Sequence, residues 1–146
     1  MDLKLKDKKV LITGSTAGIG FEMAKGFLAE GAQVVINSRS VKNLQTALEK
    51  LNHMFPEAVL EGIVADFRDP KAHEAVIKSM ESVDILVNNV GIYASKSFSE
   101  TTDEDWKEMF QVNVIEEVSR LDLFNFNINC LQSFPSKDDC QNLWNI

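Results

Sequence analysis

Cysteine is scarce in this sequence, which contains only Cys130 and Cys140 among its 146 residues. The nine residues between them, with no other soft ligand nearby, match neither the spacing of a zinc site nor a disulfide framework. We therefore expect two free thiols in a reducing compartment and no bound metal ion.

Long apolar runs and an excess of positive charge are also missing. No stretch approaches the length that spans a bilayer, and residues 1–7 lack the apolar core of a signal peptide. The formal net charge of −7 disfavours nonspecific binding to nucleic acid or to an anionic membrane. A length of 146 residues, 45% of them hydrophobic, is enough for one globular domain with a sizeable core. We expect a cytoplasmic protein with neither a nucleic-acid nor a membrane partner.

Glycine is absent after Gly91, and the character of the sequence changes near Val114. Residues 1–114 alternate strand and helix signals, whereas residues 115–146 carry five asparagines and both cysteines. Within this tail, residues 124–129 alternate apolar side chains with asparagine, a pattern that predicts a strand at a sheet edge. We divide the chain into a first unit over residues 1–114 and an atypical tail over residues 115–146.

The first unit contains four short apolar segments, and a helix signal follows each of them. The predicted strands span residues 10–12, 33–36, 58–64 and 83–87. The first predicted helix spans residues 19–30 and is ended by Gly31, and the second runs from the cap Ser40 to Pro56. The third begins at Asp69 and Pro70, and the fourth begins at Thr102, where Asp105 completes a capping box. The side chains expected on their apolar faces are Ile19, Met23, Phe27 and Leu28, then Leu44, Leu48 and Leu51, then Val76, Ile77 and Met80, and finally Trp106, Phe110 and Val114. The alternation predicts an α/β fold, a three-layer αβα arrangement in which helices cover both faces of a parallel sheet of about four strands.

Between the first strand and the first helix, the sequence reads Thr13-Gly14-Ser15-Thr16-Ala17-Gly18-Ile19-Gly20. Glycines permit a tight turn, a close approach of the backbone to phosphate and close packing of helix on strand. Unpaired N–H groups at a helix N-terminus lie at the positive end of the helix dipole and bind anions. Since an ordinary strand–helix turn needs fewer glycines, we interpret this loop as a pyrophosphate site at the carboxyl end of the sheet.

Three further motifs follow in order: Ala65-Asp66 after the third strand, Asn88-Asn89-Val90-Gly91 after the fourth, and Asn113 in the last helix. Together with the glycine loop, they resemble the short-chain dehydrogenase/reductase family. The resemblance covers residues 6 to about 114, roughly the amino-terminal half of a typical member. It implies a Rossmann-like fold and an NAD(P)-dependent oxidation or reduction of a small alcohol or carbonyl substrate.

The resemblance also implies roles for single residues. The Asp66 carboxylate would accept a hydrogen bond from the adenine amino group, although a strand-end aspartate in a turn is the structural alternative. Asn88 and Asn89 would tie neighbouring strand ends together, and Gly91 would leave room for the cofactor. Val90 stands where alanine is commoner in the family. The expected cofactor contacts are Thr13, Gly14, Ser15, Thr16, Gly18, Ile19, Gly20, Ser38, Arg39, Asp66, Phe67, Asn88, Asn89 and Gly91.

The end of the second strand bears on the choice between NAD and NADP. An acidic residue about 20 positions after the glycines would bind the ribose 2′-hydroxyl of NAD, but residues 37–40 contain no acid. Arg39 could instead pair with a 2′-phosphate, helped by the Ser38 hydroxyl. A solvated surface arginine is the alternative. We predict NADP(H) as the cofactor, with NAD as the second choice.

The catalytic groups of the family are largely missing from the sequence. Family chemistry requires a tyrosine whose pKa is lowered by a lysine four residues later, and an upstream serine. The sole tyrosine, Tyr93, has Lys96 three residues after it and precedes Asn113, so we interpret that pair as a chance occurrence. In the family, an asparagine at the place of Asn113 supports a water and the lysine of the proton relay; an exposed helical asparagine is the alternative.

Two hypotheses about function follow. The chain is an NADP(H)-dependent oxidoreductase cut short before its catalytic tyrosine and lysine, by a frameshift, a premature stop or alternative splicing near Val114. Alternatively, it is a non-catalytic nucleotide-binding or regulatory module. Members of the family form homo-oligomers, a property that we do not carry over to a partial chain.

Overall fold

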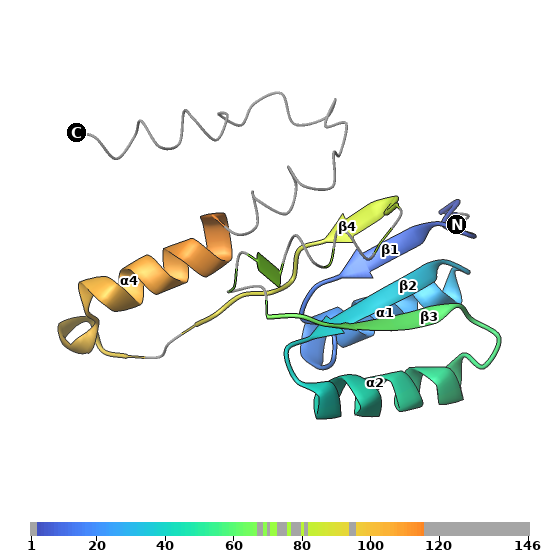
Figure 1. Cartoon of the computed structure of the whole chain (residues 1–146), viewed down its shortest axis with the longest axis horizontal. Coiled ribbons are helices and arrows are strands. Elements are labelled where there is room, and N and C mark those ends of the chain that lie inside the picture. Colours follow the sequence, from blue (N-terminus) through green and yellow to red (C-terminus); the bar gives the residue numbers. More distant parts are fainter. Residues whose placement is uncertain are drawn as a thin grey trace, which may run out of the picture.

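The computed structural model describes residues 3–66, 69, 71–72, 76, 80, 82–93 and 96–115. Across these residues, one parallel sheet runs in the order β3-β2-β1-β4 (Figure 1). Its strands are β1 (Lys9–Ile12), β2 (Gln33–Ser38), β3 (Leu60–Val64) and β4 (Ile85–Val87). Val10 lies opposite Val34 of β2 on one side and opposite Ile85 of β4 on the other. The predicted parallel sheet is confirmed, and β1 and β2 form its centre.

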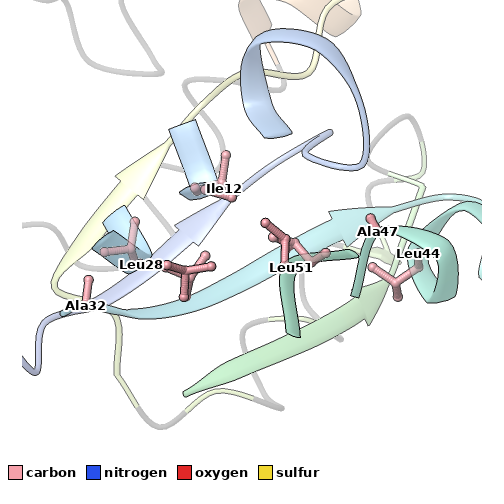
Figure 2. Packing of buried hydrophobic residues seen from close by; sticks show 10 residues of the cluster. Ile12, Leu28, Ala32, Leu44, Ala47 and Leu51 are labelled. Carbon is pink, nitrogen blue, oxygen red and sulfur yellow. The ribbon is translucent and has the colours of Figure 1, made fainter. Parts of the chain in front are cut away.

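Two helices, α1 (Gly18–Ala29) and α2 (Val41–Met54), cover one face of the sheet. Figure 2 shows their buried side chains packed against those of the two central strands. The cluster consists of Val10, Ile12, Val34 and Ile36 from the strands, Ala24, Leu28, Leu44, Ala47 and Leu51 from the helices, and Ala32. Full burial of one large aliphatic side chain contributes about 1.5–3 kcal/mol, so this layer is the main source of stability.

Both helix ends on this face follow the predicted signals. Ser40 is the N-cap of α2, and its Oγ accepts a hydrogen bond from the backbone N–H of Asn43 at 3.3 Å. Gly31 follows α1 with a φ of +80°, and its N–H donates to the carbonyl of Leu28 at 3.0 Å. A residue with a side chain is strained at this φ, which explains why glycine ends the helix.

The opposite face of the sheet carries a second core cluster. It consists of the buried residues Leu11, Val35, Ala65, Val76 and Met80. Val76 and the partly buried Ala72, which packs against the same cluster, both have helical backbone, so residues in helical conformation lie on this face as well. The predicted three-layer arrangement is therefore confirmed; Ile77, the other side chain expected here, lies outside the described residues.

The apolar face of α1 differs from the prediction. Ile19 and Met23 were expected to face inward, but their side chains are 73% and 41% exposed. Leu28 is buried as predicted, and the other buried positions of the helix are Gly20 and Ala24. Close packing against the glycine loop requires small residues, so the helix turns its glycine and alanine toward the sheet and its larger side chains outward.

Element boundaries also shift. β2 extends two residues beyond the predicted Ile36, whereas β3 and β4 each begin two residues later than predicted. After the short 3-10 helix η1 (Phe98–Glu100), the last predicted helix divides into α4 (Asp103–Phe110) and a π-helical turn, η2 (Gln111–Ile115). The capping box of Thr102 and Asp105 is confirmed, but α4 has no buried residue.

Two predictions concern residues beyond those that the structure describes. The strand over residues 124–129 and the state of Cys130 and Cys140 lie outside the described residues. Within the described part of the chain, no helix has the length and apolar character to cross a membrane. No group of three or more His, Cys, Asp or Glu side chains in that same part is arranged to hold a metal ion.

Candidate functional site

A cavity of about 320 Å³ lies at the carboxyl ends of the parallel strands. It is lined by Gly14, Thr16, Ala17, Asn37, Ser38, Arg39, Asn43, Ala65, Asp66, Asn89, Val90, Gly91 and Ile92. These residues come from the end of β2, the start of α2 and the loops after the four strands, because parallel strands bring their carboxyl ends to the same edge of the sheet. Seven of the expected cofactor contacts are among them: Gly14, Thr16, Ser38, Arg39, Asp66, Asn89 and Gly91.

The glycine loop has the backbone that an anion site requires. Gly14 and Gly18 adopt φ values of +59° and +57°, which side-chain-bearing residues rarely reach. A Cβ at Gly18 would meet no atom within 4 Å, so open space lies beside the backbone there. The N-cap of α1 is Ala17, which provides no side-chain cap. The first N–H groups of α1 are therefore left to an outside acceptor, as in anion-binding helix ends.

Gly20 serves packing rather than the wall of the cavity. A Cβ at this position would lie 2.5 Å from Nδ2 of Asn89 and 2.9 Å from the carbonyl oxygen of Gly14. Glycine thus allows α1 to approach the ends of β1 and β4. Ile19, by contrast, points outward and is 73% exposed.

Thr13 and Asn89 fasten the end of β1 to the end of β4. The Thr13 Oγ1 accepts hydrogen bonds from the N–H groups of Asn89 at 2.9 Å and Val90 at 3.1 Å, and donates to the carbonyl of Val87 at 3.3 Å. The Asn89 Nδ2 donates to the carbonyls of Thr13 at 3.1 Å and Gly14 at 3.0 Å. The tie between strand ends that the sequence predicts is made by Asn89, and Thr13 is fully buried behind it.

Ser15 is likewise fully buried, and its hydroxyl serves the fold. The Oγ donates to the carbonyl of Ile12 at 2.7 Å and accepts from the N–H of Asn37 at 2.9 Å. The Ser15 N–H also donates, to the carbonyl of Asn37 at 3.0 Å, so the hydroxyl and the N–H of this expected cofactor contact are both committed to the fold.

Ser38, Arg39 and Asp66 form the other end of the cavity. The Ser38 Oγ accepts a hydrogen bond from the N–H of Ser40 at 3.1 Å, which turns the chain into α2. Arg39 is exposed, and no hydrogen bond or ion pair joins its guanidinium group to the described residues. A cation without a partner at the rim of a cavity is available to a bound anion. Phe67, expected beside Asp66, lies outside the described residues.

Asn113 is held by two hydrogen bonds rather than exposed on a helix. Its Oδ1 accepts from the N–H of Ile92 at 2.8 Å, and its Nδ2 donates to the carbonyl of the same residue at 2.9 Å. Because Asn113 lies in the π-helical turn η2, this turn is joined to the loop that follows β4. The carboxamide is therefore committed to that loop.

Tyr93 and Lys96 do not form a catalytic pair in this geometry. The Tyr93 side chain is 87% exposed, and the Lys96 Nζ lies 2.7 Å from Oδ1 of Asp105. Hydrogen bonds from Lys96 and from Thr102 lower the pKa of Asp105 to about 2. This agrees with the interpretation of the Tyr93 and Lys96 spacing as a chance occurrence.

Some cavity residues were not predicted. Asn37 and Asn43 line the cavity but were not expected in the site, because the residue types that distinguish NAD from NADP after the second predicted strand are an acid and an arginine. Asn37 was visible as a polar residue that directly follows a buried apolar strand. Ile92 carries no comparable signal, since it enters through its backbone bond to Asn113.

The sequence of this chain is similar to those of known proteins. The family profile described as short chain dehydrogenase matches residues 8–120. The chain is 42% identical over 121 residues to an uncharacterized oxidoreductase, YvrD, of Bacillus subtilis, a match that covers 81% of this chain and 45% of that protein.

Two solved structures are similar at about 30% identity. L-sorbose reductase from Gluconobacter frateurii, in complex with NADPH and L-sorbose, superimposes with a TM-score of 0.78 at 32% identity, over 85% of this chain and 48% of that one. An NADPH-bound short chain oxidoreductase from Pseudomonas aeruginosa PAO1, with an atypical catalytic center, gives 0.75 at 30% identity, over 82% and 49%. The chain thus spans about half the length of the relatives that it matches.

Proposed function

This chain belongs to the short-chain dehydrogenase family, and from that premise we propose that its cavity binds NADP(H). In this proposal the chain is the cofactor-binding half of an oxidoreductase that acts on alcohol or carbonyl substrates. The observation that carries the proposal is the cavity itself, which joins a glycine loop without a side-chain N-cap to an arginine that pairs with no described residue.

Each part of the dinucleotide has chemically matched groups in the cavity. The pyrophosphate would accept hydrogen bonds from the N–H groups at the start of α1, beside Gly18. The 2′-phosphate would pair with the Arg39 guanidinium near the Ser38 hydroxyl. Asp66 would accept from the adenine amino group, and the backbone around Gly91 would border the ribose and nicotinamide. When bound, NADP(H) supplies the hydride that is transferred.

The preference for NADP(H) over NAD(H) rests on charge. Among the described residues that line the cavity, Arg39 is the cation, and it lies at the end of β2 where an acid would bind the free 2′-hydroxyl of NAD. Both solved relatives described above were determined with NADPH bound. A hydrogen bond between charged groups is worth about 1.5–3 kcal/mol, so the 2′-phosphate contributes about tenfold or more in affinity.

Proton transfer is assigned to groups outside this chain. The family reaction uses a Tyr-x-x-x-Lys segment, which the sequence does not contain. We propose that the chain represents a protein cut short before that segment and that it binds cofactor without catalysing hydride transfer alone. A second candidate is a non-catalytic, cofactor-binding module, which the exposure of Tyr93 and the pairing of Lys96 with Asp105 favour. A Tyr-x-x-x-Lys segment in the downstream nucleic acid, in any of three frames, separates the two.

Fluorescence titration with NADPH and NADH tests the proposed cofactor. We expect NADPH to bind at least about tenfold more tightly than NADH. Arg39→Gln should weaken NADPH binding by about 10- to 100-fold and leave NADH binding within about threefold. Lys50→Gln, which removes an exposed charge from α2, is the matched control and should leave both affinities unchanged. Equal affinity for the two cofactors, or no binding of either, would overturn the proposal.

A further inference from the structure

Asn37 is a buried polar side chain at the end of β2, with 1% of its surface exposed. Its Oδ1 accepts a hydrogen bond from the N–H of Gly14 at 3.1 Å. Its Nδ2 donates to the carbonyl of Ile63 at 3.2 Å and to the carbonyl of Ala65 at 3.1 Å. One carboxamide therefore joins the glycine loop after β1 to the end of β3, across the strand that separates them.

The backbone around Asn37 fixes the direction of this side chain. Its N–H donates to the Ser15 Oγ at 2.9 Å, and its carbonyl accepts from the Ser15 N–H at 3.0 Å. The Ser15 hydroxyl is itself anchored by donation to the carbonyl of Ile12 at 2.7 Å. Because both residues are buried, these bonds are shielded from competition with water.

On its β1 side the bridge lies beyond the last strand pair, whereas on its β3 side pairing continues to Ser38 opposite Val64. The register between β1 and β2 ends at Ile12 opposite Ile36, so Gly14 is beyond the last pair of this ladder. The glycine loop follows β1 and Ala65 follows β3, and these two strands are not neighbours, since β2 lies between them. Asn37 is positioned to hold both, and all three residues line the cavity.

We propose that Asn37 is a positioning residue that sets the distance between the two ends of the cavity. The inference rests on the proposed function, in which the glycine loop binds pyrophosphate and the end of β3 binds adenosine. A dinucleotide that contacts both ends needs them at a fixed separation, because misplacement of one end weakens contacts that are otherwise intact. A ligand that occupies one end alone does not depend on this separation.

Two substitutions separate the arms of the bridge. Asn37→Leu has a similar size and removes all three hydrogen bonds. Asn37→Asp keeps the acceptor for Gly14 but loses both donors, and it places a carboxylate against the carbonyls of Ile63 and Ala65. Asn52→Leu, at an exposed position on α2, is the matched control.

The binding test compares NADPH with adenosine 2′-phosphate, which carries only the groups assigned to the Arg39 end. Measurements are made at a temperature at which circular dichroism shows each variant to be folded. We expect Asn37→Leu to raise the Kd for NADPH by at least about tenfold and the Kd for adenosine 2′-phosphate by less than about threefold. A purely structural role predicts unchanged affinities in the folded population. Unchanged affinities, or equal losses for the two ligands, would overturn the positioning role.

Amide hydrogen exchange gives a readout that does not require a ligand. The Gly14 amide should exchange at least about tenfold faster in Asn37→Leu than in Asn52→Leu, because its acceptor is gone. The Asn89 amide, bound to Thr13, should be unaffected. Asn37→Asp should preserve protection of Gly14 and still lose NADPH affinity, and it replaces the leucine variant if that variant does not fold. Unaltered Gly14 exchange in Asn37→Leu would contradict the bridge itself.

The two proposals fail in different ways. If the wild-type chain binds neither NADPH nor adenosine 2′-phosphate, the proposed function is overturned, and the positioning role with it. If the wild-type chain binds NADPH and Asn37→Leu binds it equally well, only the positioning role is overturned.

Discussion

Thr13 shows how one hydroxyl group can hold two strand ends together. Thr13 is fully buried, and its Oγ1 accepts hydrogen bonds from two backbone N–H groups and donates one to a backbone carbonyl. Thr13→Val keeps the shape of the side chain but leaves the N–H groups of Asn89 and Val90 without their acceptor. Each unsatisfied buried group costs about 1–3 kcal/mol, so we expect the free energy of unfolding to fall by about 2–4 kcal/mol.

Urea denaturation measures this loss, and Thr46→Val provides the control. Thr46 lies on the exposed side of α2 and bonds only to the carbonyl of Lys42 in its own helix. Its substitution should change the free energy of unfolding by no more than about 0.5 kcal/mol. Equal stability of the two variants would show that the Thr13 network does not stabilise the junction of β1 and β4.

The residues of the site were predictable to different degrees. Gly14 and Gly18 were visible because a positive φ favours glycine whatever the tertiary context. Arg39 was visible because of its distance from the glycine loop. Asn37 was visible only as a polar residue after an apolar strand, and its bridging role was not predictable, since that role depends on Ala65, which follows it by 28 residues and reaches it only through strand pairing.

At the scale of elements, the packing of α1 can be tested with its two interior glycines. A Cβ at Gly20 would lie within 2.9 Å of backbone atoms of the loop, whereas a Cβ at Gly26 would meet nothing within 4 Å. Gly20→Ala should therefore destabilise the protein by about 1–3 kcal/mol, as overpacking does. Gly26→Ala should stabilise it by about 0.5–1 kcal/mol, because alanine has the higher helix propensity.

Thermal or urea denaturation of the two alanine variants checks this pair. The contrast between them is the test, since both replace a glycine of the same helix by the same residue. Similar changes in stability at Gly20 and Gly26 would mean that α1 does not pack on the glycine loop as closely as the structure indicates.

The start of α4 should respond to acid at a lower pH than an ordinary aspartate does. Hydrogen bonds from Lys96 and Thr102 hold the pKa of Asp105 at about 2, below the ordinary value of 3.8. Because the folded-state pKa is lowered, the stabilisation by this carboxylate is complete above about pH 4 and is lost as the pH falls toward 2. NMR titration of the Thr102 amide should give a midpoint near pH 2.

Two variants on α4 frame this titration. Asp105→Asn removes the titrating group and should abolish the transition at Thr102. Glu108→Gln, on the same helix, should leave it in place. A midpoint near 3.8 would contradict the capping geometry.

Elements were predictable where local pattern and tertiary context agree. The prediction of α2 was correct in its N-cap and in the burial of Leu44 and Leu51, because the apolar residues of this helix recur on one face. The predicted apolar face of α1 was wrong at Ile19 and Met23, because close approach of the helix to the glycine loop outweighs the burial of these two side chains. The π-helical turn η2 was not predicted, since it occurs where Asn113 bonds to Ile92, a residue 21 positions earlier that no local pattern connects to it.

At the scale of the whole molecule, the three layers and the place of the cavity followed from the alternation of strands and helices. Parallel strands gather their carboxyl ends at one edge, so the motifs after each strand had to meet there. The substrate side could not be predicted in the same way. The chain spans about half the length of its relatives, and the proton-transfer residues of the family have no counterpart in its sequence.

The central claim is that NADP(H) binds across the carboxyl ends of all four strands. The most direct measurement is a titration of the ¹⁵N-labelled chain with NADPH, followed by the backbone amide signals. We predict shifts at the glycine loop, at Ser38 and Arg39, at Asp66 and around Gly91, with α4 residues such as Lys107 unaffected. No shifts at millimolar NADPH, or shifts confined to α4, would contradict the claim.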